Sequence, residues 1–264
     1  MGKNRNSDSV ELHPEIVEDF IGGKRKKKRE DKVEEETEGK ELPTVSIAVA
    51  GSIIDNTQSF EQATRLAGQI ARAATIFRVD EVVVFDNESD SLDKDDSLAR
   101  NDSGENESGA SFLIKILRYL ETPQYLRKAL FPKCSSLRFV GLLPPLDAPH
   151  HLRKHEWAPF REGVTLRRDD SLSQVTPVDV GLSKNVNVNQ AFESGIRVTV
   201  AMGQNRNLDE HPRPVVSPST PRKETGIYWG YKVRYASNLS SVLSKCPYKG
   251  SYDLVIGTSE HGQK

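Results

Sequence analysis

A strand–helix–strand pattern near the start of the chain constrains the fold more than any other feature. Residues 44–50 form a run of small and β-branched side chains that ends at Gly51, and residues 81–86 form a second apolar run. Between them, apolar side chains recur at spacings of three and four from Phe60 to Phe77, which is typical of one helical face. Two strands joined by a helix usually lie parallel in one sheet. The sequence therefore predicts an α/β fold built on a parallel sheet.

Three later segments extend this pattern. Residues 112–130 carry a second helical stripe, and the apolar residues 137–143 predict a third strand. Near the end of the chain, residues 252–257 predict a strand buried on both faces, because a short apolar run bounded by turn residues suits a parallel sheet. Residues 43–158 and 236–264 are therefore predicted to form one α/β domain.

Residues 159–235 follow a different pattern. Short apolar segments at 175–180, 186–188, 196–202 and 227–235 are separated by Gly, Pro and Asn, and no long helical stripe interrupts them. Several short strands divided by turn residues are typical of a small barrel or sandwich. We therefore expect a β module inserted within the α/β domain.

Two segments are too polar to predict a packed structure. Residues 1–42 form a charged tail with a basic run at 24–29, and residues 87–109 form an acidic insertion rich in Ser, Asp and Asn. We expect the tail to be disordered and the insertion to be mobile. The basic run fits a nuclear localisation signal or a nucleic-acid-binding arm, and it equally fits a solvated tail.

Composition limits the compartment and the classes of site. The formal net charge is -1, and the two cysteines, Cys134 and Cys246, are far apart in the sequence without a second ligand cluster. A disulfide framework and a zinc site are therefore not expected. No apolar run is long enough to span a bilayer, and the N-terminus lacks the apolar core of a signal peptide. We expect a soluble intracellular protein.

The segment 227–235 alternates with a period of two. One face carries aromatic and aliphatic side chains, including Trp229, and the other carries Lys232 and Arg234. Aromatic faces that stack bases and cations that bind phosphates are typical of single-stranded RNA binding. For the aromatic face, a role in the core of the β module is the favoured alternative. For Lys232 and Arg234, we predict RNA contact, with a solvated surface as the alternative.

A proline-stiffened turn at residues 144–155 contains three histidines and the two cations Arg153 and Lys154. Its histidine spacing matches no zinc pattern, because His150 and His151 are adjacent and no carboxylate or thiolate stands at a spacing that supports one. We expect structural or RNA-facing roles for the histidines, and we assign Arg153 and Lys154 to RNA binding.

The loop after the predicted last strand offers groups that bind polar cofactors. It carries glycines, hydroxyls and a carboxylate in the order Gly257, Thr258, Ser259, Glu260, His261, Gly262. Ligands of open α/β sheets lie beyond the carboxyl ends of the strands, where such a loop would be. The loop matches neither a serine-hydrolase elbow nor a P-loop, and the chain has no dinucleotide fingerprint after its first strand.

Five segments together resemble the SPOUT-class RNA methyltransferases that carry an OB-like insertion, a family whose human member is described as centromere- and spindle-associated. The resemblance extends over nearly all residues after Thr44. The segments that carry it are VSIAVAGSIIDN at 45–56, FLIKILRYLETPQYLRKALFP at 112–132, LRFVGLLPPLDAPHHLR at 137–153, GIYWGYKVRYAS at 226–237 and YDLVIGTSEHG at 252–262.

The resemblance implies a SPOUT-like α/β domain with a C-terminal trefoil knot, and an OB-like barrel at 159–235 that holds RNA. It implies S-adenosylmethionine as the cofactor, RNA as the partner and a homodimer for full-length members, in the nucleus, the nucleolus or the cytoplasm. The residues that match the first cofactor-proximal loop of the family are Gly257, Thr258, Ser259, Glu260 and Gly262.

Family members continue past this loop with two further glycine-rich cofactor loops and a final helix. We therefore expect this chain to be C-terminally truncated, and we assign no catalytic residue. Two alternatives stay open. The chain could be a non-catalytic module that binds RNA or another partner. It could also fail to fold stably, because a sheet that lacks strands exposes an unpaired edge.

Overall fold

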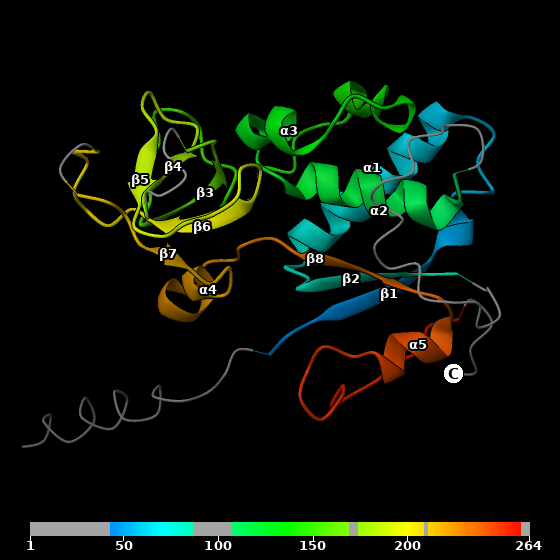
Figure 1. Ribbon diagram of the computed structural model, residues 1–264. Coiled ribbons are helices and arrows are strands. Elements are labelled where there is room, and N and C mark those ends of the chain that lie inside the picture. The colour runs from blue at the N-terminus through cyan, green and yellow to red at the C-terminus, as the bar shows by residue number, and fades with distance from the viewer. Residues whose placement is uncertain (1–42, 87–106, 169–173, 209–210, 260–264) are drawn as a thin grey trace, which may run out of the picture. The chain divides into compact units, whose positions relative to one another are not determined.

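Three parallel strands form the first sheet, in the order β1-β2-β8 (Figure 1). β1 is Ser46–Ala50, β2 is Glu81–Phe85 and β8 is Lys232–Ala236. β2 lies in the middle and pairs in parallel with both neighbours. The parallel sheet that the strand–helix–strand pattern predicts is confirmed.

The computed structural model describes residues 43–86, 107–168, 174–208 and 211–259. The predicted tail at 1–42 and most of the predicted acidic insertion at 87–109 lie outside the described residues. Residues Thr44–Lys264 form one unit. No helix in the described part of the chain is long and apolar enough to cross a membrane.

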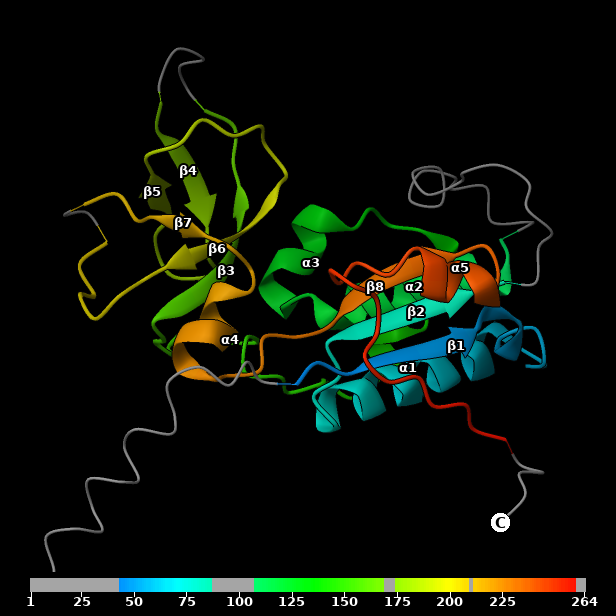
Figure 2. The same ribbon diagram turned by 90° about the horizontal axis from the view of Figure 1, so that it is seen from below.

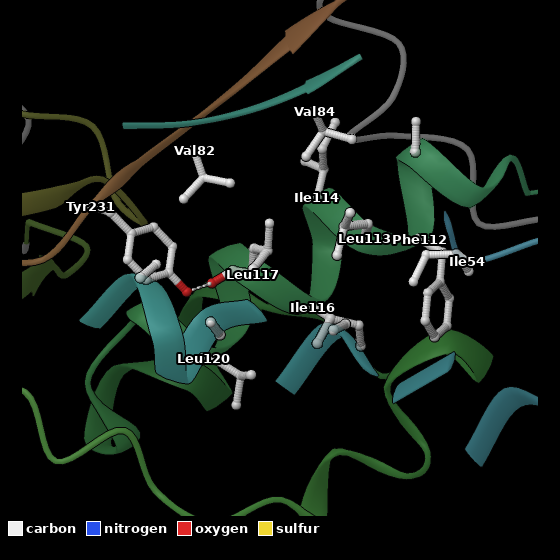
Figure 3. Close-up of a cluster of buried hydrophobic side chains, with 14 of the residues drawn as sticks. Ile54, Val82, Val84, Phe112, Leu113, Ile114, Ile116, Leu117, Leu120 and Tyr231 are labelled. Atoms are coloured by element: carbon white, nitrogen blue, oxygen red, sulfur yellow. Dashed lines mark hydrogen bonds between the residues drawn. The ribbon is translucent and has the colours of Figure 1, made fainter. Parts of the chain in front are cut away.

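Two long helices cover one face of the parallel sheet. These are α1 (Phe60–Ile76) and α2 (Gly109–Glu121), seen from the other side of the sheet in Figure 2. They pack against the side chains of Val82 and Val84, which point to that face (Figure 3). Val83 points the other way and contacts the short helix α5 (Leu239–Ser244). This alternation follows from the period of two in a strand, and it buries β2 on both faces.

The start of α1 is fixed by its capping residues. The Ser59 hydroxyl accepts a hydrogen bond from the Gln62 N–H at 3.2 Å, and the Gln62 side chain accepts one from the Gln58 N–H at 3.0 Å. The first bond satisfies a backbone donor that the first turn of a helix leaves without a partner, and the second fixes the residue before the N-cap.

The second sheet is antiparallel and curled, with the order β5-β4-β3-β6-β7 (Figure 1). Its strands are β3 (Phe160–Thr165), β4 (Thr176–Asp179), β5 (Val186–Val188), β6 (Arg197–Ala201) and β7 (Val215–Val216). A separate apolar core fills it, made of Val178, Val180, Val186, Val188, Val198, Val200 and Met202. The β strands predicted at 175–180, 186–188 and 196–202 are confirmed.

Short helices complete the described chain. They are the 3-10 turn η1 (Gly51–Ile53), α3 (Gln124–Leu130), the 3-10 turns η2 (Ser135–Leu137) and η3 (Val140–Leu142), and α4 (Thr220–Thr225).

The strand predicted at residues 137–143 is wrong, because η2 and η3 occupy this segment. Leu137, Val140 and Leu143 pack against the core beside α1 and α2, whereas Leu142 is exposed. A spacing of three places these side chains on one side of a 3-10 backbone, so the apolar run buries one side without strand pairing.

The strand predicted at 227–235 is wrong in its limits and in its sheet. Gly230 has a φ of +86°, which ends the extended segment, and β8 begins at Lys232 in the parallel sheet. Tyr231 packs into the core of α1 and α2, and its hydroxyl donates to the Leu117 carbonyl at 3.0 Å (Figure 3). Tyr231, Val233 and Tyr235 of the aromatic face therefore pack in the core of the parallel sheet, whereas Trp229 lies against Phe160 of the antiparallel sheet. The division of the chain into domains at 159 and 235 stays a prediction.

The strand predicted at 252–257 is also wrong. Residues 252–259 form no strand, and Leu254, Val255 and Ile256 are 76%, 61% and 75% exposed. An apolar run forms a strand when a neighbouring strand accepts its backbone hydrogen bonds, and the described residues supply no such partner here.

We expect Gly51→Ala to destabilise the protein, because α2 packs directly on this glycine. A Cβ at Gly51 would lie 2.4 Å from the Ala110 Cβ and 2.6 Å from the Ala110 Cα. Overpacking of this kind costs about 1–3 kcal/mol. Gly141→Ala is the matched control, since a Cβ at that residue meets nothing within 4 Å. Urea unfolding followed by circular dichroism measures both variants, and an equal change in the two would contradict this packing.

Candidate functional site

The segment that leads to the predicted cofactor loop is anchored by Tyr252. Its hydroxyl donates to Glu81 Oε2 at 2.9 Å and accepts from Arg234 Nη2 at 3.0 Å, while Arg234 Nε donates to Glu81 Oε1 at 2.8 Å. Burial and the neighbouring Glu81 carboxylate raise the pKa of Tyr252 to about 12, so its hydroxyl keeps its proton at neutral pH. The three side chains hold the final segment to β2 and β8.

Beyond Tyr252 the predicted cofactor residues lie open to solvent. Gly257, Thr258 and Ser259 are exposed, and a Cβ at Gly257 would meet no atom within 4 Å. Glu260 and Gly262 lie outside the described residues. The described part of this loop therefore offers backbone N–H groups and hydroxyls, but it does not enclose a cofactor.

The four predicted RNA-binding cations have different surroundings. Arg153 and Lys154 are exposed on the loop before β3, and Lys232 is exposed at the start of β8. Arg234 is not: its side chain is 18% exposed and forms an ion pair with the buried Glu81. The structure therefore gives Arg234 a structural contact, which sequence alternation alone does not reveal.

A buried cluster of charges joins α2 to the antiparallel sheet. Arg197 on β6 contacts Glu121 at the end of α2 through both terminal nitrogens, at 2.6 and 3.0 Å. Its Nε donates to Glu162 Oε2 on β3 at 2.7 Å. Both carboxylates are buried, so one guanidinium balances two acidic groups in a setting of low dielectric constant. Burial opposes ionisation of Glu121, but Arg197 and His150 outweigh it and lower the pKa of Glu121 to about 2.

Two histidines and a tryptophan complete this cluster. The Nε2 atoms of His150 and His151 lie 2.8 and 2.7 Å from the Glu121 carbonyl, to which each ring donates an N–H. Trp229 Nε1 donates to Glu162 Oε1 at 2.6 Å. Burial and the neighbouring His150 lower the pKa of His151 to about 4. His150 and His151 therefore have structural contacts, and a structural role is one of the two that we expect from the sequence.

Sequence reasoning did not identify Glu121, Glu162 or Arg197. In the sequence they appear only as charged residues within apolar segments. Charged residues on the exposed face of a helix or strand give the same pattern, so the sequence does not distinguish the two. Among the described residues, no group of three potential ligands could hold a metal ion. The arrangement offers a fixed junction of the two sheets, an exposed basic loop and an open polar loop.

A search of protein families matches residues 44–264 to the family described as "Putative RNA methyltransferase". The chain is 46% identical over 243 residues to the human "28S rRNA (uridine-N(3))-methyltransferase", covering 90% of this chain and 64% of that protein. It is 47% identical over 221 residues to the mouse protein of that name, covering 83% and 57%, and 41% identical over 257 residues to the Drosophila melanogaster protein, covering 94% and 53%. The chain thus spans less than two thirds of the length of these relatives.

We expect Arg197→Met to destabilise the protein strongly, because it leaves Glu121 and Glu162 buried without a balancing charge. Removing one partner of a buried ion pair costs about 3–5 kcal/mol. Arg65→Met is the matched control, since Arg65 pairs with Glu61 on the surface of α1 and such pairs contribute about 0.5 kcal/mol. Equal urea midpoints for the two variants would show that the cluster does not stabilise the junction.

We also expect stability to fall as the pH drops from 6.5 to 4, because the unfolded state binds a proton at His151 before the folded state does. The loss at pH 4 is at most about 3 kcal/mol. His151→Gln keeps an N–H donor for the Glu121 carbonyl and removes the titration. Urea unfolding of both proteins across this pH range gives the comparison, and parallel stability curves would rule out the assigned role of His151.

Proposed function

The chain belongs to the family of RNA methyltransferases, which it matches over residues 44–264. We therefore propose that the protein methylates RNA. The proposed methyl donor is S-adenosylmethionine, and the proposed class is SPOUT, with the curled sheet as an OB-like module that holds RNA. The observation that carries the proposal is the identity of 46–47% with two 28S rRNA (uridine-N(3))-methyltransferases. It supports N3 of a uridine in large-subunit ribosomal RNA as the target.

The methyl donor is assigned to the loop that begins at Gly257. Thr258 and Ser259 are exposed there and offer hydroxyl and N–H groups, and Tyr252 fixes the start of the segment. S-adenosylmethionine, when bound, supplies an activated methyl group. The described residues do not enclose it, so we derive no chemical step from them and assign no catalytic residue.

The proposed substrate also bears on the compartment in which the protein acts. A large-subunit ribosomal RNA is available in the nucleus, including the nucleolus, and in the cytoplasm. We propose that the protein acts there as a homodimer. A centromere- and spindle-associated role for the human family member is a separate expectation of the resemblance.

RNA binding without methyl transfer is the second candidate function. It is favoured by one contrast within the structure: the loop with Arg153 and Lys154 is tied to buried residues, whereas Gly257, Thr258 and Ser259 lie open to solvent. In this case the exposed cations would supply affinity through phosphate contacts.

The two functions are separated by a transfer assay. Protein that contains this sequence is incubated with tritiated S-adenosylmethionine and large-subunit ribosomal RNA from cells that lack the modification. We expect label in RNA and its loss, by roughly tenfold or more, in Thr258→Ala/Ser259→Ala, because each lost polar contact to a bound ligand costs about 1 kcal/mol or more. Ser240→Ala, on the exposed side of α5, is the control. RNA that is bound but unlabelled would reject methyl transfer and support the second function.

A further inference from the structure

An exposed basic loop and an aromatic ring lie together at one end of the antiparallel sheet. Residues 153–155 are Arg, Lys and His, and all three are exposed. Trp157 follows directly, and its Nε1 donates to the Gly203 carbonyl at 2.9 Å. The Arg206 guanidinium carbon lies 5.9 Å from the centroid of the Trp157 ring. The loop before β3 and the loop after β6 therefore meet at Trp157.

The buried side chain of Arg161 fixes the backbone of the basic loop at 153–156. Arg161 is 1% exposed, and its guanidinium donates to the carbonyls of Glu156 at 2.9 Å, Arg153 at 3.0 Å and Val180 at 2.5 Å. The Glu156 carboxylate in turn accepts the Arg153 N–H at 2.7 Å. The backbone of the loop is thus fixed before any ligand binds, which lowers the entropic cost of binding.

Among the described residues of this surface, the exposed charged side chains are all positive. Arg153, Lys154 and Arg206 are exposed, while the nearby Glu156 is half-buried and directed at the loop backbone. The chain as a whole has a net charge of -1, so this concentration of cations is local. A partner that carries regularly spaced negative charge would be attracted to these cations.

We propose that Arg153, Lys154, Trp157 and Arg206 form a contact surface for single-stranded RNA, called here the Trp157 surface. The inference rests on the proposed RNA function and adds Trp157 and Arg206 to it. Planar groups favour RNA over an acidic protein, because an arginine over an indole ring offers a plane on which bases stack while the cations bind phosphates.

Arg234 is less suited to RNA contact than the cations of the Trp157 surface. Arg234 is tied to Glu81 and Tyr252, so its charge is already balanced inside the fold. Within the described part of the chain, Arg153, Lys154 and Arg206 form no ion pair, and all three are exposed.

The test measures anisotropy of a fluorescein-labelled, uridine-rich RNA of about 15 nucleotides, which is near the upper site size of one such module. We expect Lys154→Ala/Arg206→Ala to weaken binding by about tenfold or more. The slope of log affinity against log salt should fall by about 1.4, which corresponds to two lost phosphate contacts on a single strand. Arg72→Ala, on an exposed position of α1, is the matched control and should change affinity by less than about twofold.

The outcomes separate this surface from the proposed function. The basic run at 24–29 is identical in every variant, so its contribution cancels in the comparison. If the unaltered chain binds RNA and the double variant matches Arg72→Ala, the Trp157 surface is rejected while RNA binding stands. If the unaltered chain does not bind RNA, the RNA function fails and the surface fails with it. Displacement of the RNA by polyglutamate at equal charge would point to an acidic protein partner instead and would also reject the proposal.

Intrinsic fluorescence locates the bound RNA independently. The chain has two tryptophans, Trp157 and Trp229. We expect RNA to quench the emission of the Trp229→Phe variant, in which Trp157 is the remaining indole, and to leave the emission of Trp157→Phe unchanged. The opposite pattern would place the RNA near Trp229 and overturn the assignment.

Discussion

The contact of Arg197 with Glu121 and Glu162 is the interaction on which the arrangement of this protein depends. It joins the end of α2, which belongs to the parallel sheet, to β3 and β6 of the antiparallel sheet. Because the carboxylates of Glu121 and Glu162 are buried, separating α2 from the antiparallel sheet would leave a buried charge without its partner or expose it to solvent. Arg197 thus fixes the end of α2 to β3 and β6.

The junction and the basic loop share a strand. Glu162, which Arg197 holds, follows Arg161, which fixes the carbonyls of the loop at 153–156. Adjacent residues of a strand point to opposite faces, so β3 directs one side chain into the junction and the other beneath the loop. The same strand therefore stabilises the contact between the sheets and presents the cations proposed to bind RNA.

Periodicity predicted the elements whose side chains repeat regularly. The stripe from Phe60 to Phe77 gave α1, and the alternating valines at 186–188 gave β5. It failed at residues 137–143 and 252–257, where the apolar runs pair with no strand among the described residues, and at Gly230, where a positive φ ends the extended segment before β8. The exposed cations of the site are visible in sequence. The contact between Trp157 and Arg206 joins residues far apart in the chain, so no local pattern encodes it.

We propose that this protein binds RNA at the end of its antiparallel sheet, through the Trp157 surface. The most direct measurement is photo-crosslinking of 4-thiouridine RNA to the protein, followed by mass spectrometry of the crosslinked peptides. Our account predicts crosslinks in the peptides that contain Trp157 and Arg206. Crosslinks confined to β8 and the segment around Tyr252, with none near Trp157, would contradict it.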